Sequence, residues 1–334
     1  MPSLSQAIDG IADRAGFAGV VRVDRGGEPV FARAYGLADR ANRIPNTVET
    51  RFAIASGSKG LTALAVASLI EDGALAMTTV ARSVLGRDLP LIDDAVTVEH
   101  LLAHRSGIGD YLDEDAGHDV TDYLPVPAHA LATTEQFLAV LDGHPAKFAP
   151  GERFCYCNGG YVVLALIAER VGGTPFHDLV EQRVCARAGM RDSAFLRADA
   201  LPGGTAVGYL SSAPGARTNV FHLPVRGNGD GGVYSTVADI SAFWRHLFAG
   251  DIVPGARVAE MVRPHSDAPA ESMRYGLGFW LHATSEAVLL EGCDAGVSFQ
   301  TMHHPRTGAT YTVVSNSSDG AWPVVQFLYD LLAG

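Results

Sequence analysis

A serine and a lysine stand three residues apart where an apolar run passes into an apolar helix. They are Ser56 and Lys59, in the segment 52–59. Side chains at positions i and i+3 of a helix share a face, so the hydroxyl and the amine can meet. A serine hydroxyl becomes a good nucleophile when a neighbouring base takes its proton. The S-x-x-K spacing therefore predicts nucleophilic catalysis by Ser56, with Lys59 as its base.

The predicted helix would support this chemistry. A lysine acts as a base only when burial and nearby dipoles disfavour its ammonium form, and an apolar helix N-terminus does both. Backbone N–H groups at that N-terminus can also bind an oxyanion. The chain has only two lysines, Lys59 and Lys147, among 25 basic residues. A serine three residues before a lysine still arises by chance in about one in nine such sequences, so the motif needs support from elsewhere.

That support comes from Tyr156 and Asn158, about a hundred residues further on. In an extended segment, residues two apart point the same way. A phenol near a lysine ammonium can hold a lowered pKa and act as a second base, and an amide can anchor both the lysine and a substrate carbonyl. The alternative interpretation of Tyr156 is a core tyrosine whose hydroxyl is hydrogen-bonded.

In this order and spacing, the two motifs resemble those of the penicillin-recognising serine hydrolases. The sequence is most similar to their class C β-lactamase branch, which also holds carboxylesterases, D-aminopeptidases, D-alanyl-D-alanine carboxypeptidases and acyltransferases. Three further stretches fit the resemblance, which runs from about residue 15 to the C-terminus: 101–108, 231–236 and 275–278.

The resemblance implies a role for each motif residue. Ser56 is expected to be the acylated nucleophile and Lys59 its base partner. Tyr156 is expected to shuttle protons in acylation and deacylation, and Asn158 to position substrate. The implied activity is hydrolysis of an ester or amide. A β-lactamase or D-Ala carboxypeptidase proper, an acyltransferase and a non-catalytic ligand-binding member of the fold stay open as alternatives.

The family's third motif is a cationic residue or histidine, then a small residue and a glycine, on a strand beside the site. The resemblance matches it to the segment Asp294-Ala295-Gly296, with Cys293 as the fallback register. Gly296 would let the strand edge approach a substrate, and the N–H of Val297 would join that of Ser56 in the oxyanion hole.

Asp294 stands where the family has a cation, and this changes the expected substrate. At about 4 Å and an effective dielectric of 20, its repulsion of a substrate carboxylate is on the order of 4 kcal/mol before screening. We therefore expect neutral or cationic esters and amides to be preferred over anionic β-lactams.

Strand patterns lie at both ends of the chain. Two β-rich runs, 19–23 and 29–35, flank a hairpin turn. A buried helix is expected over 57–71. Four more strands and a final helix are predicted near the C-terminus, at 275–281, 287–290, 298–303, 309–315 and 324–332.

Helical patterns fill the middle of the chain, at 97–103, 134–142, 159–171 and 175–189. We therefore predict an α/β (α+β) fold of the β-lactamase type. Residues 1–75 and 221–334 would form a domain around an antiparallel sheet flanked by helices. Residues 76–220 would form a mainly helical domain, with the active site in the cleft between the two.

Composition narrows the possible partners. The chain has 334 residues, of which 47% are hydrophobic and 19% charged, as in a folded globular protein. Its net charge of −12 disfavours nucleic acid and anionic membranes as partners. No apolar stretch reaches 18 residues, so no membrane span is expected. We expect a small-molecule ester, amide or β-lactam as substrate, with no metal and no organic cofactor, and the oligomeric state is open.

The compartment is predicted from the N-terminus and the cysteines. The N-terminal pattern is a surface helix rather than a leader, and the four cysteines fit reduced thiols. Both features predict a cytoplasmic protein, or a periplasmic or secreted one if a leader has been removed.

Two other motifs suggest different chemistry. Residues 227–232 match G-x-G-x-x-G but lack the βαβ context of a dinucleotide site. His104 and Ser106 could pair as base and nucleophile, although their place in a turn after a helix favours capping of backbone groups.

Histidines and cysteines suggest a metal site only weakly. The candidates are His303-His304 and the pair Cys155 and Cys157. Adjacent histidines on a strand point to opposite faces, and neither pair has the spacing of a metal motif.

Overall fold

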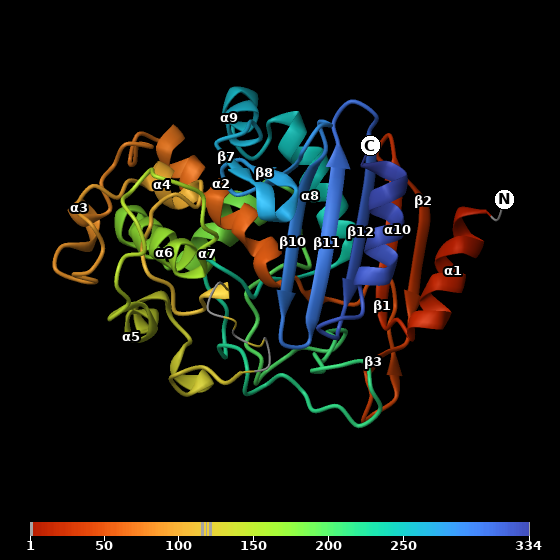
Figure 1. Ribbon diagram of the computed structural model, residues 1–334. Helices are drawn as coiled ribbons and strands as arrows, with labels where there is room; N and C mark the ends of the chain where they lie inside the picture. The colour runs from red at the N-terminus through yellow and green to blue at the C-terminus, as the bar shows by residue number, and fades with distance from the viewer. Residues whose placement is uncertain (1–2, 115–116, 118, 120–121, 334) are drawn as a thin grey trace.

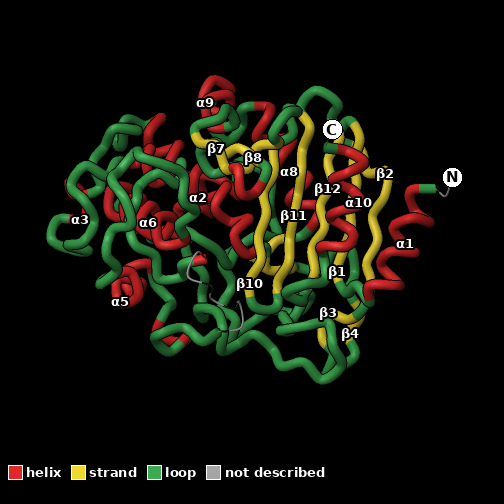
Figure 2. Tube along the Cα trace, in the orientation of Figure 1, coloured by secondary structure: helices red, strands yellow, loops and turns green. Residues whose placement is uncertain are grey.

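One antiparallel sheet of eight strands forms the centre of the described part of the chain (Figures 1 and 2). The computed structural model describes every residue except 1–2, 115–116, 118, 120–121 and 334. The strand order is β2-β1-β12-β11-β10-β9-β8-β7. The strands are β1 (Gly19–Arg25), β2 (Glu28–Tyr35), β7 (Ser266–Ala268), β8 (Met273–Tyr275), β9 (Trp280–His282), β10 (Val288–Asp294), β11 (Val297–His304) and β12 (Ala309–Ser315). Because β1 pairs with β12, the two ends of the chain build one sheet, and this prediction is confirmed.

Helices cover both faces of this sheet. They are α1 (Leu4–Ala15), α2 (Ser58–Glu71), α8 (Val237–Ala249) and α10 (Trp322–Leu332). α1 and α10 pack on the face to which Leu289 points. α2 and α8 pack on the opposite face, to which the next residue, Leu290, points. This alternation along β10 is the two-residue period of a strand buried on both sides.

Helix α2 lies between the sheet and a second group of helices (Figure 1). Its residues from Ser58 to Leu69 are all buried, which is typical of a helix that is apolar on every side. The second group comprises α3 (Arg82–Leu85), α4 (Val98–Leu102), α5 (Leu138–Leu141), α6 (Asn158–Gly172) and α7 (Phe176–Val180). This arrangement fits the predicted α/β class, while the proposed boundaries at 75 and 220 stay a prediction.

Shorter elements complete the chain. They are β3 (Leu37–Asp39), β4 (Ile44–Pro45), β5 (Phe52–Ala53), β6 (Tyr234–Ser235), α9 (Gly255–Met261), the 3-10 turns η1 (Ala55–Gly57), η3 (Ala128–Ala130), η4 (Thr134–Phe137) and η6 (Pro269–Glu271), and the π-helical turn η5 (Glu181–Cys185). β3 pairs with β4, and β5 pairs with β6. No helix of the described residues is long and apolar enough to cross a membrane.

Three predicted elements are divided in the structure, one of which is the helix expected over 134–142, found as η4 followed by α5. The single strand expected over 275–281 is two antiparallel strands, β8 and β9, because the chain turns between them with Gly278 at φ 91°. Only glycine adopts such a φ at no steric cost. The helix expected over 175–189 is α7 followed by the π-helical turn.

Candidate active site

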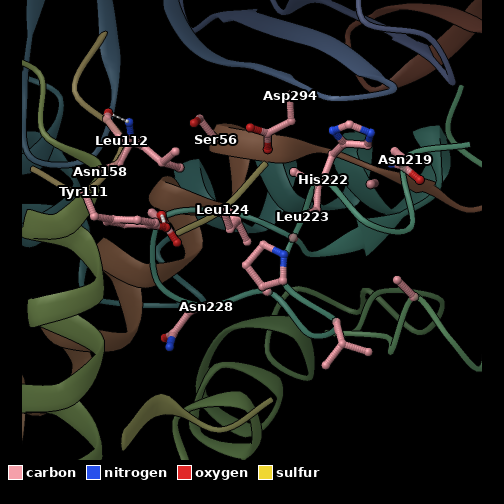
Figure 3. Close-up of a pocket in the computed structure, with 18 of the residues that line it drawn as sticks. Ser56, Tyr111, Leu112, Leu124, Asn158, Asn219, His222, Leu223, Asn228 and Asp294 are labelled. Atoms are coloured by element: carbon pink, nitrogen blue, oxygen red, sulfur yellow. Dashed lines mark hydrogen bonds between the residues drawn. The ribbon is translucent and has the colours of Figure 1, made fainter. Parts of the chain in front are cut away.

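Ser56 lies in the tight turn η1, which connects β5 to the buried helix α2. The turn is strained, since Ala55 has a φ of +46°. The Ser58 hydroxyl holds it in place by donating to the Ala55 carbonyl at 2.7 Å and accepting from the Val233 N–H at 3.1 Å. The local sequence thus presents Ser56 at the N-terminus of α2, facing a cavity (Figure 3).

Lys59 is buried one helical turn away, with only 2% of its surface exposed. Its Nζ lies 2.9 Å from Ser56 Oγ, 2.8 Å from Asn158 Oδ1 and 2.8 Å from the Asp230 carbonyl oxygen. An ammonium can donate to all three oxygens. A neutral amine can donate to the Asn158 and Asp230 oxygens and direct its lone pair at the Ser56 hydroxyl. The geometry therefore suits both protonation states that a general base must adopt.

Asn158 is the first residue of α6, and its own bonds fix its orientation. Its backbone N–H donates to Asp110 Oδ2 at 2.5 Å. Its side-chain Nδ2 donates to the Leu112 carbonyl at 3.0 Å and to Glu114 Oε1 at 3.4 Å. The amide oxygen is left to face Lys59.

Tyr156 packs over the same amine. Lys59 Nζ lies 4.9 Å from the centre of the Tyr156 ring, and the phenol forms a hydrogen bond with Ser56. Trp280 stacks on the ring at 5.8 Å between centroids, and His104 lies 4.4 Å away. The structure thus brings together Ser56, Lys59, Tyr156 and Asn158.

The expectation that the pKa of Tyr156 is lowered is wrong. Burial raises the pKa of this phenol well above its usual value, and the negative charge of Glu114 raises it further. The hydrogen bond with Ser56 acts in the opposite direction but is the smaller effect. Tyr156 is therefore a neutral phenol in the free protein and can serve first as a proton donor.

His104 is a buried neighbour whose position was not predicted. It adopts a left-handed φ of +54°, and its Nδ1 accepts the Cys157 N–H at 3.1 Å. Burial, and then the charge of Lys59, hold the pKa of His104 well below its usual value. The imidazole is therefore neutral and packs against Tyr156 rather than facing the cavity.

The glycine-rich segment 227–232 forms one wall of the site. Its backbone supplies the Asp230 carbonyl to Lys59. A side chain on Gly229 would lie 2.1 Å from the Tyr161 carbonyl oxygen, so this glycine permits close packing against α6. This packing role explains the glycine motif without a bound dinucleotide. No sequence signal indicates that the Asp230 carbonyl would contact Lys59.

The third motif lies in a different register from the expected one. Gly292 is the glycine that lies against the nucleophile, since a side chain there would come 2.6 Å from the Ser56 nitrogen. Gly296, with a φ of 72°, lies in the two-residue turn between β10 and β11 and packs against Gly208 and Tyr209.

Strand register also decides which backbone N–H groups of this motif face the nucleophile. The His282 N–H donates to the Ala287 carbonyl at 3.0 Å. Backbone groups alternate in direction along a strand, so Ala287 and every second residue after it direct their N–H and C=O groups toward the edge of β10 on the β9 side. Cys293 is one of these residues. The pairing of β10 with β9 ends at Leu289, and beyond it this edge of β10 lies beside η1. Val297 pairs with Asp294 at the end of the hairpin, so its N–H points into the sheet. This register does not fit the oxyanion role expected of Val297, and it directs the N–H of Cys293, the alternative residue of the motif, toward η1.

Asp294 projects into the cavity beside Ser56 (Figure 3). A Cβ atom added to Gly231 would lie 3.6 Å from one carboxylate oxygen of Asp294 and 3.5 Å from the Ala55 carbonyl. Burial raises the pKa of Asp294 to about 7, although the positive charge of Lys59 opposes the shift. The carboxylates of Asp230 and Glu114 raise it further.

The cavity has a volume of about 420 Å³. Its walls come from residues 111–112 and 122–125, from 219–225, from the segment 227–232 and from the end of β10. Among the described residues, five carboxylic acids line it: Glu114, Asp119, Asp122, Asp230 and Asp294. Among the described residues, no group of three or more His, Cys, Asp or Glu is placed to hold a metal ion.

The fold and this S-x-x-K turn define a known class of proteins. A sequence model of the family described as "Beta-lactamase" matches residues 4–326. The chain therefore belongs to the beta-lactamase family.

Three relatives show the range of this class. Penicillin-binding protein 4* of Bacillus subtilis is 27% identical over 85% of the chain and 64% of its own length. Esterase EstB of Burkholderia gladioli is 34% identical over 64% of the chain and 56% of its own length. The chain thus spans less than two thirds of either relative. The crystal structure of a penicillin-binding protein from Bacillus halodurans is 35% identical and matches with a TM-score of 0.90, over 97% of this chain and 100% of that one.

The raised pKa of Asp294 predicts a pH-dependent effect on stability. The folded protein holds this proton up to about pH 7, whereas an unfolded Asp loses it near pH 4. Stability contributed by the carboxylic acid is therefore lost as pH rises from about 4 to 7. Asp294→Asn removes this loss, so the variant should gain on the order of 2 kcal/mol relative to wild type between about pH 5 and pH 8. Urea unfolding at both pH values measures it.

The exposed carboxylate Asp267 provides the control. Asp267→Asn should show the same stability difference from wild type at both pH values. An equal difference for Asp294→Asn at both values would contradict the assigned burial of this acid.

Proposed function

We propose that this protein is a serine hydrolase that forms an acyl-enzyme at Ser56 and hydrolyses an ester or an amide. The observation that carries the proposal is the 2.9 Å contact between Lys59 Nζ and Ser56 Oγ, with Asn158 and Asp230 accepting the other two N–H groups. The relatives support it, because one is named an esterase and others penicillin-binding proteins.

Acylation would begin with Lys59 in its neutral form. Ser56 Oγ attacks the substrate carbonyl carbon while its proton passes to Lys59 Nζ. The N–H groups of Ser56 and Cys293 would stabilise the oxyanion that forms. As the intermediate collapses, the Tyr156 phenol gives its proton to the leaving group, and the Lys59 ammonium returns a proton to the phenolate. The products of this step are the acyl-enzyme and a protonated leaving group.

Deacylation would use the same groups in reverse. A water molecule takes the place of the leaving group near Tyr156. It gives a proton to the Tyr156 oxygen as its own oxygen attacks the ester carbonyl, while the phenolic proton passes to Lys59. Collapse then releases the acid, and Ser56 Oγ regains its proton from Lys59. Asn158 would hold the amine in place throughout, because its own amide is fixed by the Leu112 carbonyl.

The cavity favours neutral or cationic substrates. Asp294 and Asp230 both line it, and no lysine or arginine is among the described residues of its wall. Once Asp294 is ionised, above about pH 7, a substrate carboxylate next to it would meet a repulsion on the order of 4 kcal/mol before screening. We therefore propose esters or amides, rather than anionic β-lactams, as the efficient substrates.

Covalent labelling tests the nucleophile. A fluorophosphonate should add once to the wild-type protein, at Ser56, as seen by intact mass and peptide mapping. Ser56→Ala should give no adduct, and Lys59→Met should react at least about a thousandfold more slowly because the base is lost. Ser83→Ala, which removes an exposed hydroxyl, should label like wild type.

Folding is checked in each variant by circular dichroism. A full adduct on Ser56→Ala, or a wild-type labelling rate for Lys59→Met, would contradict the proposed roles.

A comparison of substrates tests the preference. At about pH 8, where Asp294 is ionised, the kcat/KM for p-nitrophenyl acetate should exceed that for nitrocefin, because nitrocefin carries a carboxylate that Asp294 repels. Nitrocefin turned over far faster than the ester would show that this preference is wrong.

A further inference from the structure

We infer that the acyl portion of the substrate carries an ammonium group, and that Asp294 binds this group in the cavity beside Ser56. The inference rests on the proposed function, because it names the substrate class of the same site. It makes Asp294 a specificity-determining residue.

The first observation is that Asp294 lacks the kind of partner that the neighbouring acids have. Asp230 accepts the Tyr111 hydroxyl at 2.5 Å, and Glu114 accepts the Asn158 amide at 3.4 Å. For Asp294, the described residues supply charge interactions and burial but no hydrogen bond. Partial burial without a donor already disfavours the ionised form of this acid and raises its pKa to about 7. A bound ammonium would supply the missing donor and favour the carboxylate.

The second observation is the unbalanced charge of the cavity. Glu114, Asp230 and Asp294 line it, and the described part of its lining contains no basic side chain other than His222. Lys59 lies behind Ser56, where three oxygens already surround its Nζ. The positive charge of Lys59 lowers the pKa of Asp294 but offsets only part of the upward shift. A ligand that brings a positive charge would therefore be favoured over one that brings none.

The third observation places the ammonium on the acyl side of the scissile bond. The leaving group needs the proton of Tyr156, and neither Tyr156 nor its stacking partner Trp280 is among the residues that line the cavity. The leaving group must therefore point away from the cavity, which leaves the cavity to the acyl group. Figure 3 shows Ser56 and Asp294 side by side at one rim of this space.

The strand geometry adds a second acceptor. The carbonyl of Cys293 faces the same edge of β10 as its N–H, because both groups of one residue point the same way. An ammonium near the scissile carbonyl could donate to this oxygen and to the Asp294 carboxylate together. Aminoacyl esters and amides have this arrangement.

Matched pairs of phenyl esters test the inference. Alanine phenyl ester, as both enantiomers, is compared with the isobutyrate ester, and the β-alanine ester with the butyrate ester. Within each pair, an ammonium replaces a methyl group of similar size. For wild-type protein, kcat/KM should be at least about tenfold higher for the ammonium ester in one pair or both. Asp294→Asn should lower that ratio by about tenfold or more, and the exposed control Asp267→Asn should keep it.

The outcomes separate this inference from the proposed function. If the esters acylate Ser56 by intact mass but wild type shows no preference in either pair, the inference is overturned and the serine hydrolase stands. A preference that Asp294→Asn keeps also overturns it. If no ester acylates Ser56, the proposed function fails together with the inference.

Discussion

The organisation of the site depends on one buried amine. Lys59 Nζ contacts oxygens from three parts of the chain: the Ser56 turn, the start of α6 at Asn158 and the glycine-rich segment at Asp230. A buried charge is tolerated only when its donors are satisfied, so each of these segments must hold its oxygen in place. Removing one oxygen would leave one N–H of this ammonium without an acceptor in the core. The position of the nucleophile is therefore linked to the packing of α2, α6 and the segment 227–232.

Sequence spacing was sufficient to predict each local pair of site residues and the general fold. Ser56 and Lys59 are one helical turn apart, and Tyr156 and Asn158 are two residues apart in an extended segment, so short-range geometry fixes each pair. Their meeting needed the resemblance to a family, because no local rule brings together segments a hundred residues apart. The sheet built from both termini followed from strand periods at the two ends.

Long-range effects explain what the sequence did not predict. The pKa of Tyr156 depends on burial beneath Trp280 and His104, which come from distant segments. The register of β10 depends on its pairing with β9 and β11, and that pairing brings Gly292 and Cys293, rather than Gly296 and Val297, to the nucleophile. The same register directs Asp294 into an acidic cavity. The pairing of β10 therefore affects which substrate charge the cavity would favour.

A crystal structure of the protein after reaction with a fluorophosphonate would show whether Lys59 and Ser56 act together. We expect phosphorus bonded to Ser56 Oγ, with Lys59 Nζ still in contact with that oxygen and with Asn158 Oδ1. One phosphonyl oxygen should lie about 2.7 to 3.1 Å from the backbone nitrogens of Ser56 and Cys293. Phosphorus on another side chain, or a Lys59 amine turned away from Ser56, would contradict the account.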